Sequence, residues 1–374
     1  MDLFSSSYSD EYFRPDKLRI ARMAKSLSMD DLAKIIGKSK QFIHKLERKG
    51  CDPNPETLSL LCNALDIESI FLYSERDSHI ETEKCHFRSL KTRTKTLTLN
   101  VKYGVEILTS VIKKLETEIE LPEVDLPDVS DKFDISMLED IEKLSESVRA
   151  YWQIGVGPIS NITETLEGLG IIIATANSSS GKVDAFSVAQ HSRPLIILDN
   201  LSASTCRNRF TLAHELGHLL FHDEIVTGDS KTESQANYFA SSFLLPRFSF
   251  CSEFPCSGEG RYDWDAMVQF KLRWKVSLKA IIYRATQLGL ISPNKARTGY
   301  MYLNTRGFVH NELGDSSIAN EEPIILLQMV NILELSTWRE LLHDLGVSEV
   351  LLYKLYKIRH HHSTLHKKPH LRLV

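Results

Sequence analysis

The sequence predicts a multidomain, mainly α-helical protein that contains one α+β domain. Its 374 residues exceed the roughly 250–300 residues at which single hydrophobic cores stop growing, so two or more domains are expected. Helical periodicity dominates both ends of the chain, whereas helix and strand patterns alternate from about residue 134 to residue 246. Charge is also divided, because residues 14–50 carry a net charge of +7 and residues 116–146 carry −10. This division favours a nucleic-acid-facing end and an acidic spacer.

The composition excludes several classes of protein. Apolar residues make up 42% of the chain and charged residues 25%, as in soluble globular proteins. No run approaches the roughly 18 consecutive apolar residues of a membrane span, and residues 1–13 show no secretory signal. The six cysteines are scattered without a Cys-x-x-Cys pair, which favours reduced, buried thiols. We therefore expect a cytoplasmic protein with no membrane partner.

Residues 14–73 predict a small all-α domain with helices over residues 17–26, 29–36, 40–48 and 56–65. The second and third helices, joined through a glycine turn, follow the helix-turn-helix plan. The face packed between them is expected to contain Ala33, Ile36, Ile43 and Leu46. The residues expected to contact DNA are Ser39, Lys40, Gln41, His44 and Lys45. A helical bundle with a solvated basic face is the alternative.

Residues 74–134 predict a helical connector that ends in an acidic linker. The spacing of a coiled-coil seam is followed by Val101, Val105, Leu108, Ile112, Leu115 and Ile119. Because the seam spans under three heptads, packing on the same chain and a dimer zipper are equal alternatives. The acidic residues 120–134 are punctuated by proline, which predicts an exposed linker. We recognise no internal repeat in the sequence.

A metal site is predicted in the helix that contains RNRFTLAHELGHLLFHDE. His214 and His218 are four residues apart, so on a helix their imidazoles point the same way and can share one zinc ion. Glu215 lies about 100° around the helix, beside the metal, where it can take a proton from metal-bound water. This is the chemistry of the HExxH pattern, and it predicts Glu215 as the catalytic base. The alternative is a satisfied pair of core histidines.

The next helix, in KTESQANYFASSFLLP, supplies the third expected ligand, Glu233, and leaves the fourth metal position open. Asn237 follows one turn later and is expected to hydrogen-bond a ligating histidine. Alternatively, Glu233 closes a capping box that begins at Ser230. Two histidines and one carboxylate favour Zn²⁺, although Mn²⁺ or iron would fit the same ligands. For the transition-state stabiliser we consider His222, which could instead pack near the site, and Arg209.

Two segments resemble known families. LAKIIGKSKQFIHKLERKGCDPNPETLSLLCNALDI resembles the phage-repressor-like (XRE) helix-turn-helix domains, which implies binding to a double-stranded DNA operator, usually as a homodimer. The chain departs from that family at Met29-Asp30-Asp31, where a glutamine often makes a phosphate contact. RxRFTLAHELGHLLFH followed by ExQANxFAxxFLLP resembles the ImmA/IrrE metallopeptidases. That resemblance covers about residues 135–302 and implies a gluzincin-like domain with a small sheet, with His214, His218 and Glu233 as ligands and Glu215 as base.

The remaining ranges complete the expected organisation. We expect a metallopeptidase domain over residues 135–250, a small helical module over 251–302, and a helical C-terminal region over 303–374. The tail KIRHHHSTLHKKPHLRLV has five histidines and, counting from Lys354, six cations, and we expect it to be solvated and disordered. Contact with nucleic acid and binding of a stray metal are the alternatives for this tail.

Three functions are compatible with this organisation. The first is a DNA-binding regulator whose peptidase cleaves a repressor-like protein, or its own acidic linker, to control genes of phage, mobile elements or stress responses. The second is a non-proteolytic repressor, the antitoxin of a toxin–antitoxin pair, whose peptidase fold binds a partner such as a toxin. In the third, the acidic segment 116–146 mimics DNA phosphates and masks the basic domain until it is cut.

Overall fold

The computed structural model describes residues 12–49, 51–76, 85–87, 95–129, 133–176, 185–188, 193–199, 204–222, 229–255, 260–308, 311–361 and 372–373. The chain divides into two compact units. Unit 1 contains residues 1–82, 92–121 and 326–374, and unit 2 contains residues 83–91 and 122–325. Each unit therefore combines segments that lie far apart in the sequence. The domain ranges expected from the sequence stay predictions.

Unit 1 begins with the helix-turn-helix that the sequence predicts. Its helices are α1 (Pro15–Ala24), α2 (Met29–Ile35), α3 (Lys40–Lys49), α4 (Pro55–Leu65) and α5 (Ser69–Tyr73). Ser28 caps α2 in a capping box with Asp31, and the Ser39 side chain accepts from the Phe42 N–H at the start of α3. The expected inner face is confirmed, because Ala33, Ile36, Ile43 and Leu46 are each at most 4% exposed.

The connector helix, α6 (Lys95–Glu118), belongs to unit 1 and packs on its own chain. It contacts α1 and also α16 (Leu335–Leu345), which lies much later in the sequence. Leu108 and Leu115 of the expected seam are fully buried by these contacts, and Val105 is 1% exposed. Of the two alternatives for the seam, the described contacts therefore support packing within the chain.

Unit 1 is completed by late segments of the chain: most of α15 (Ile325–Ile332), then α16 and α17 (Glu349–Tyr356). A short antiparallel pair joins β2 (Ile119–Glu120) to β6 (Arg372–Leu373). The histidine-rich tail from residue 362 to residue 371 lies outside the described residues, so its expected disorder stays a prediction.

A buried ion pair fastens the helix-turn-helix. Arg22 on α1 binds both carboxylate oxygens of Glu47 on α3, at 2.5 and 2.8 Å, and donates to the Leu27 carbonyl at 2.7 Å. The two side chains are only 5% and 2% exposed. The pair thus fixes α3, which carries the expected DNA-contacting residues, against α1.

Unit 2 is built on a four-stranded sheet in the order β1-β4-β5-β3. Its strands are β1 (Cys85–Phe87), β3 (Ile172–Ala176), β4 (Ala185–Val188) and β5 (Leu195–Asp199). β3 and β5 are parallel, whereas β4 runs antiparallel to both β5 and β1. β3, β4 and β5 all lie within residues 134–246, where the sequence predicts alternating helices and strands. β1 was not expected, because it comes from the connector.

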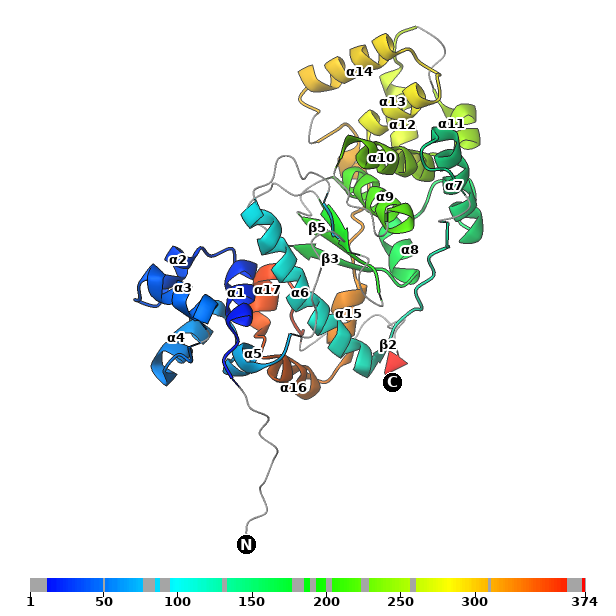
Figure 1. Cartoon of the computed structure of the whole chain (residues 1–374). Helices are drawn as coiled ribbons and strands as arrows, with labels where there is room; N and C mark the ends of the chain where they lie inside the picture. The colour runs from blue at the N-terminus through cyan, green and yellow to red at the C-terminus, as the bar shows by residue number, and fades with distance from the viewer. Residues whose placement is uncertain are drawn as a thin grey trace. The chain divides into compact units, whose positions relative to one another are not determined.

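The helices of unit 2 are α7 (Leu138–Tyr151), α8 (Ile162–Gly168), α9 (Thr205–Phe221), α10 (Ser230–Leu244), α11 (Arg247–Glu253), α12 (Trp264–Trp274), α13 (Leu278–Gln287) and α14 (Pro293–Thr305), with a short 3-10 turn at Asp315–Ser317. Figure 1 shows α9 and α10 side by side, and both belong to one packed core with the sheet. α9 contacts β4 and β5 directly. This contact places the predicted HExxH helix on the sheet.

Two further contacts position the elements around α10. Arg284 on α13 binds Glu142 on α7 at 2.5 and 2.9 Å, and the Tyr238 hydroxyl on α10 donates to the same carboxylate at 3.1 Å.

The start of the expected linker is also held by unit 2: the Asp125 carbonyl accepts from Trp152 Nε1 and the Asp125 carboxylate accepts from the Tyr151 hydroxyl. Among the described residues, no helix is long and apolar enough to cross a membrane.

Replacing Glu47 by alanine should destabilise unit 1. The change leaves the Arg22 guanidinium buried without its carboxylate, and breaking a buried pair in this way costs about 3–5 kcal/mol. Urea unfolding of the full chain, followed by circular dichroism, should show an earlier first transition. Glu75→Ala removes the partner of Arg14 from an ion pair whose glutamate is 85% exposed, so it serves as the control. Equal midpoints for the two variants would contradict the assigned role of Glu47.

Candidate metal centre

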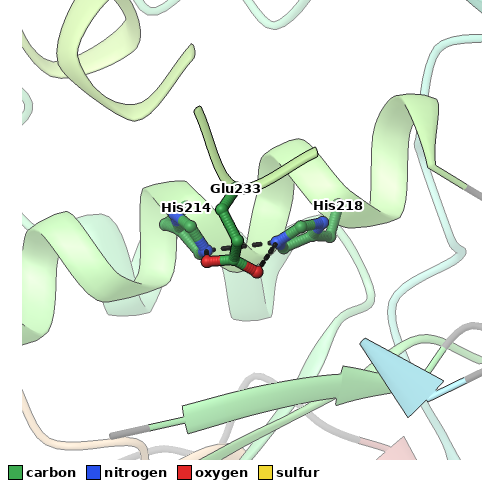
Figure 2. A group of neighbouring side chains, drawn as sticks. All are labelled: His214, His218 and Glu233. Atoms are coloured by element: carbon green, nitrogen blue, oxygen red, sulfur yellow. Dashed lines mark hydrogen bonds and ion pairs between the residues drawn. The ribbon is translucent and has the colours of Figure 1, made fainter. Parts of the chain in front are cut away.

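His214 and His218 lie one turn apart on α9, and Glu233 approaches them from α10. Nε2 of His214 is 3.1 Å from Nε2 of His218. Oε2 of Glu233 is 3.5 Å from the first of these nitrogens, and Oε1 is 3.7 Å from the second. Both histidines are fully buried, and the glutamate side chain is 19% exposed. Figure 2 shows the carboxylate facing both rings, so three side chains that can each ligate a metal meet at one point.

A glycine on α9 allows the two helices to approach closely. A Cβ atom at Gly217 would lie 3.1 Å from the Phe239 ring of α10 and 3.3 Å from the Phe221 ring. These distances are tighter than ordinary van der Waals contact, so a side chain at this position would force the Phe239 or Phe221 ring to shift by a few tenths of an ångström. The glycine in the HExxH segment therefore allows these two rings to pack closely where α9 meets α10.

The start of α10 differs from the capping box expected at Ser230. The N-cap is Asp229, whose carboxylate accepts from the N–H groups of Lys231 and Thr232 at 2.9 and 2.8 Å. Asp229 thereby satisfies the backbone at the helix start. In the described structure the Glu233 carboxylate instead lies against the two histidines, which favours the ligand interpretation over the cap.

Asn237 sets the tautomer of His214. Its Oδ1 lies 3.0 Å from Nδ1 of His214. Because an amide oxygen only accepts hydrogen bonds, Nδ1 carries the proton and Nε2 keeps a lone pair. Asn237 is one helical turn after Glu233 and therefore points to the same side of α10. This is the contact that the sequence analysis expected of Asn237.

A chain of hydrogen bonds sets the tautomer of His218. Gln235 Nε2 donates to the Ile135 carbonyl at 2.7 Å, which fixes its amide so that Oε1 accepts from Nε2 of His222 at 3.0 Å. Nδ1 of His222 is then an acceptor, and the protonated Nδ1 of His218 donates a hydrogen bond to it at 2.8 Å. Burial lowers the pKa of His222, in agreement with a neutral ring. Nε2 of His218 is left with its lone pair directed at His214 and Glu233.

The chemistry of this group fits a cation. With the tautomers assigned above, two imidazole nitrogens and a carboxylate all turn lone pairs to one buried point, where they would repel one another without a positive charge. Four ligands at about 2.1 Å in a tetrahedron are separated by about 3.4 Å. The observed separations of 3.1, 3.5 and 3.7 Å bracket this value. The donor set therefore fits a zinc-type ion held by His214, His218 and Glu233.

Glu215 faces the sheet beside the three candidate metal ligands. It is fully buried, and its Oε2 accepts a hydrogen bond from the Ser187 hydroxyl on β4 at 2.7 Å. Ser187 is itself fully buried, so the bond orients the carboxylate in a site screened from water. Ser187 cannot be identified from the sequence, because nothing in the pattern of that strand indicates which helix covers it.

The two residues considered as transition-state stabilisers lie in other networks. His222 contacts His218 through Nδ1 and Gln235 through Nε2, as described above, so it orients a ligand. Arg209 is 1% exposed and forms a buried ion pair with Glu321, and its Nη2 donates to the Ile159 carbonyl at 2.8 Å. These contacts give Arg209 a role in packing α9, and they offer no support for either residue as a stabiliser.

The sequence analysis also missed Gln235, although the residue lies within the block ExQANxFAxxFLLP that carries the resemblance. Its spacing of two from Glu233 places it on a different side of α10, which is why ligand spacing alone did not identify it. Its importance appears only when the Ile135 carbonyl, one hundred residues earlier, is placed beside it.

In the helix-turn-helix, the residues expected to meet DNA remain accessible. Lys40, Gln41, His44 and Lys45 are exposed on α3, and Ser39 is exposed at its N-terminus. Their neighbours Ile43 and Leu46 are buried, so the polar residues share the outer face. This is the arrangement that a recognition helix requires.

Comparisons with known families agree with this division. Residues 166–286 match the family model of the IrrE N-terminal-like domain, a peptidase family, and residues 18–72 match a helix-turn-helix model. Both resemblances found in the sequence are thereby confirmed over these ranges. No curated protein matches the chain. The chain therefore carries a DNA-binding helix-turn-helix followed by an ImmA/IrrE peptidase-like domain.

Asn237→Ala should weaken zinc binding by about 10–100-fold, as expected when the partner that orients a ligating histidine is lost. The purified full chain can be titrated with zinc against a chromogenic chelator. Asn237→Asp keeps an oxygen acceptor for Nδ1 of His214 and should retain most of the affinity. An alanine variant with native affinity would exclude this role for Asn237.

Proposed function

We propose that this chain is a cytoplasmic transcriptional regulator that binds operator DNA and has zinc-dependent endopeptidase activity. Its substrate is a repressor-like protein or the chain itself, and cleavage controls genes of phage, mobile elements or stress responses. The observation that carries the proposal is the convergence of His214, His218 and Glu233 beside Glu215, in the same chain as a helix-turn-helix. A metal is the proposed cofactor, with Zn²⁺ favoured and Mn²⁺ possible for the same ligands.

Each residue has a defined task in this proposal. His214, His218 and Glu233 hold the ion, which when bound supplies Lewis-acid polarisation and lowers the pKa of water. Glu215 accepts a proton from the attacking water and later delivers it to the leaving amine. Asn237 and the His222–Gln235 pair keep the two histidines in the ligating tautomer. Ser187 orients the Glu215 carboxylate. On α3, Ser39, Lys40, Gln41, His44 and Lys45 are proposed to contact the operator.

One observation favours a second candidate, the non-proteolytic repressor or antitoxin. His214, Glu215 and His218 are all fully buried in the described structure. A buried metal site is also what a peptidase fold retained as a binding platform would show, with the metal serving stability and the partner, such as a toxin, bound elsewhere. The two candidates share the ligand set and differ in whether Glu215 is used.

Glu215→Gln should abolish cleavage and retain the metal. The glutamine keeps the size of the side chain and an oxygen acceptor for Ser187, but it cannot accept the proton. The protein should be purified without chelator and its bound metal measured. Native and variant chains are then incubated with the repressor-like and toxin-like proteins encoded beside the gene, and products are identified by intact mass.

The outcomes separate the two candidates. Stoichiometric zinc in both chains, with cleavage by the native chain alone, supports the peptidase-regulator. Zinc with tight partner binding, repression unaffected by Glu215→Gln and no cleavage supports the antitoxin platform. Undiminished cleavage by the variant would refute Glu215 as the base. His214→Ala serves as the matched control, because it should lose the metal and cleavage together.

Ser187→Ala should lower kcat by about tenfold with little change in KM, because one orienting hydrogen bond contributes on the order of 1–1.5 kcal/mol. Once a cleaved substrate is known, the two constants can be measured separately. Ser187→Thr retains the hydroxyl and should restore most of kcat. A rise in KM at constant kcat would instead assign Ser187 to substrate binding.

A further inference from the structure

Two helix pairs in unit 1 have the same layout. α4 (Pro55–Leu65) is followed by α5, which begins at Ser69, and α16 (Leu335–Leu345) is followed by α17, which begins at Glu349. The start and end of the first helix and the start of the second helix all recur 280 positions later. The residue after the first helix adopts the left-handed conformation in each pair, with φ of 55° at Asp66 and 64° at Gly346. The two helix pairs therefore turn in the same way.

The sequences of the two helix pairs also agree at several positions. Aligned at the same interval, identical residues occur at Thr57 and Thr337, Leu61 and Leu341, Leu65 and Leu345, Leu72 and Leu352, and Tyr73 and Tyr353. Apolar character is kept at Ile67 and Val347, Ile70 and Val350, and Phe71 and Leu351. The leucines that match between the two copies are at most 8% exposed. This is a degenerate internal repeat, which the sequence analysis did not recognise because the matches are scattered.

The two copies pack against each other through equivalent residues. Ile67 forms an antiparallel bridge with Val347, its own counterpart. The Glu68 N–H donates to the Gly346 carbonyl at 2.9 Å, and the Ser348 N–H donates to the Asp66 carbonyl at 3.4 Å. The two bonds are equivalent, because Glu68 corresponds to Ser348 and Asp66 corresponds to Gly346. A contact in which residue i meets j and j meets i is isologous, the geometry of a two-fold dimer interface.

We propose that α16–α17 is an internal copy of α4–α5 that occupies, in the same chain, the surface through which two helix-turn-helix domains would pair. The chain then presents one recognition helix to DNA. This proposal does not depend on the peptidase activity. It argues against the homodimer expected from the sequence, because α16–α17 already covers the surface through which such a dimer would form.

Differences between the copies favour pairing within the chain. A Cβ atom at Gly346 would lie 2.4 Å from the Phe71 nitrogen and 2.7 Å from the Phe71 Cβ. The counterpart of Gly346 is Asp66, so a second α4–α5 pair docked in the same way would bring an aspartate into this contact. Asp66 also accepts from Lys354 at 2.7 Å, whereas the counterpart of Lys354 is Ser74. Steric fit and charge thus both favour pairing of α4–α5 with α16–α17 of the same chain over pairing with α4–α5 of a second chain.

The DNA-facing residues are compatible with this arrangement. Lys40, Gln41, His44 and Lys45 are exposed while α16–α17 is in place. Dimeric helix-turn-helix proteins bind two half-sites about one helical turn apart, and the symmetry of the operator mirrors that of the protein. A chain with one recognition helix should instead select a site without two-fold symmetry.

The pairing can be tested with the double variant Ile67→Cys/Val347→Cys. Directly opposed residues in an antiparallel bridge have Cα atoms about 4.5–5.5 Å apart, which suits a disulfide. Oxidation of the full chain should give an intrachain bond and no covalent dimer on non-reducing gels. The single variants Ile67→Cys and Val347→Cys, oxidised in parallel, control for the native cysteines. An interchain bond would overturn the proposal, because it would show that the pairing occurs between chains.

DNA binding provides the second test. The native chain and the oxidised double variant are used to select duplexes from a random-sequence library. Both should recover the same motif without two-fold symmetry, and their affinities for the recovered duplex should agree within about twofold. Recovery of an inverted repeat, or loss of binding on oxidation that reduction restores, would overturn the proposal. The reduced double variant shows whether the substitutions themselves disturb binding.

Discussion

Unit 2 depends on one electrostatic constraint: three groups turn lone pairs to the same buried point between α9 and α10. Such an arrangement favours a cation at that point, and the surrounding structure holds the three side chains in place. Gly217 leaves room for the Phe239 and Phe221 rings to pack closely against α9. Asp229 caps α10, which leaves Glu233 to face the histidines, and the Glu142–Arg284 pair with Tyr238 ties α7, α10 and α13 together. The cost of assembling the ligands is thus distributed over the core.

The residues that act through helical spacing could be predicted from the sequence. His214, His218 and Glu215 follow from the 3.6-residue period, as do the buried residues between α2 and α3. The supporting residues could not be predicted in this way. Ser187 reaches Glu215 from a strand, and Gln235 acts through a carbonyl at residue 135. Which strand covers a helix, and which loop meets it, depends on tertiary packing that a periodic pattern does not contain.

The order of segments along the chain does not indicate which of them form unit 1. The connector helix and the late helices appeared in the sequence as separate regions, yet they pack on the helix-turn-helix. The internal repeat was hidden for a related reason: its matches are scattered, and they become visible once Ile67 is paired with Val347. Buried charges join distant segments in the same way, as Arg209 does with Glu321 in unit 2.

The discontinuity of unit 1 has a consequence for biosynthesis. Residues 12–76 leave the ribosome early, but α16 and α17 are synthesised only after all of unit 2. Until then the apolar face around Ile67 and Phe71 lacks its cover, and nascent chains on neighbouring ribosomes expose the same face to one another. Folding of this unit closes a loop of more than 250 residues, which is a slow, high-contact-order step. The aspartate at residue 66, a poor fit for a second copy of the same face, would then also protect the growing chain from premature association.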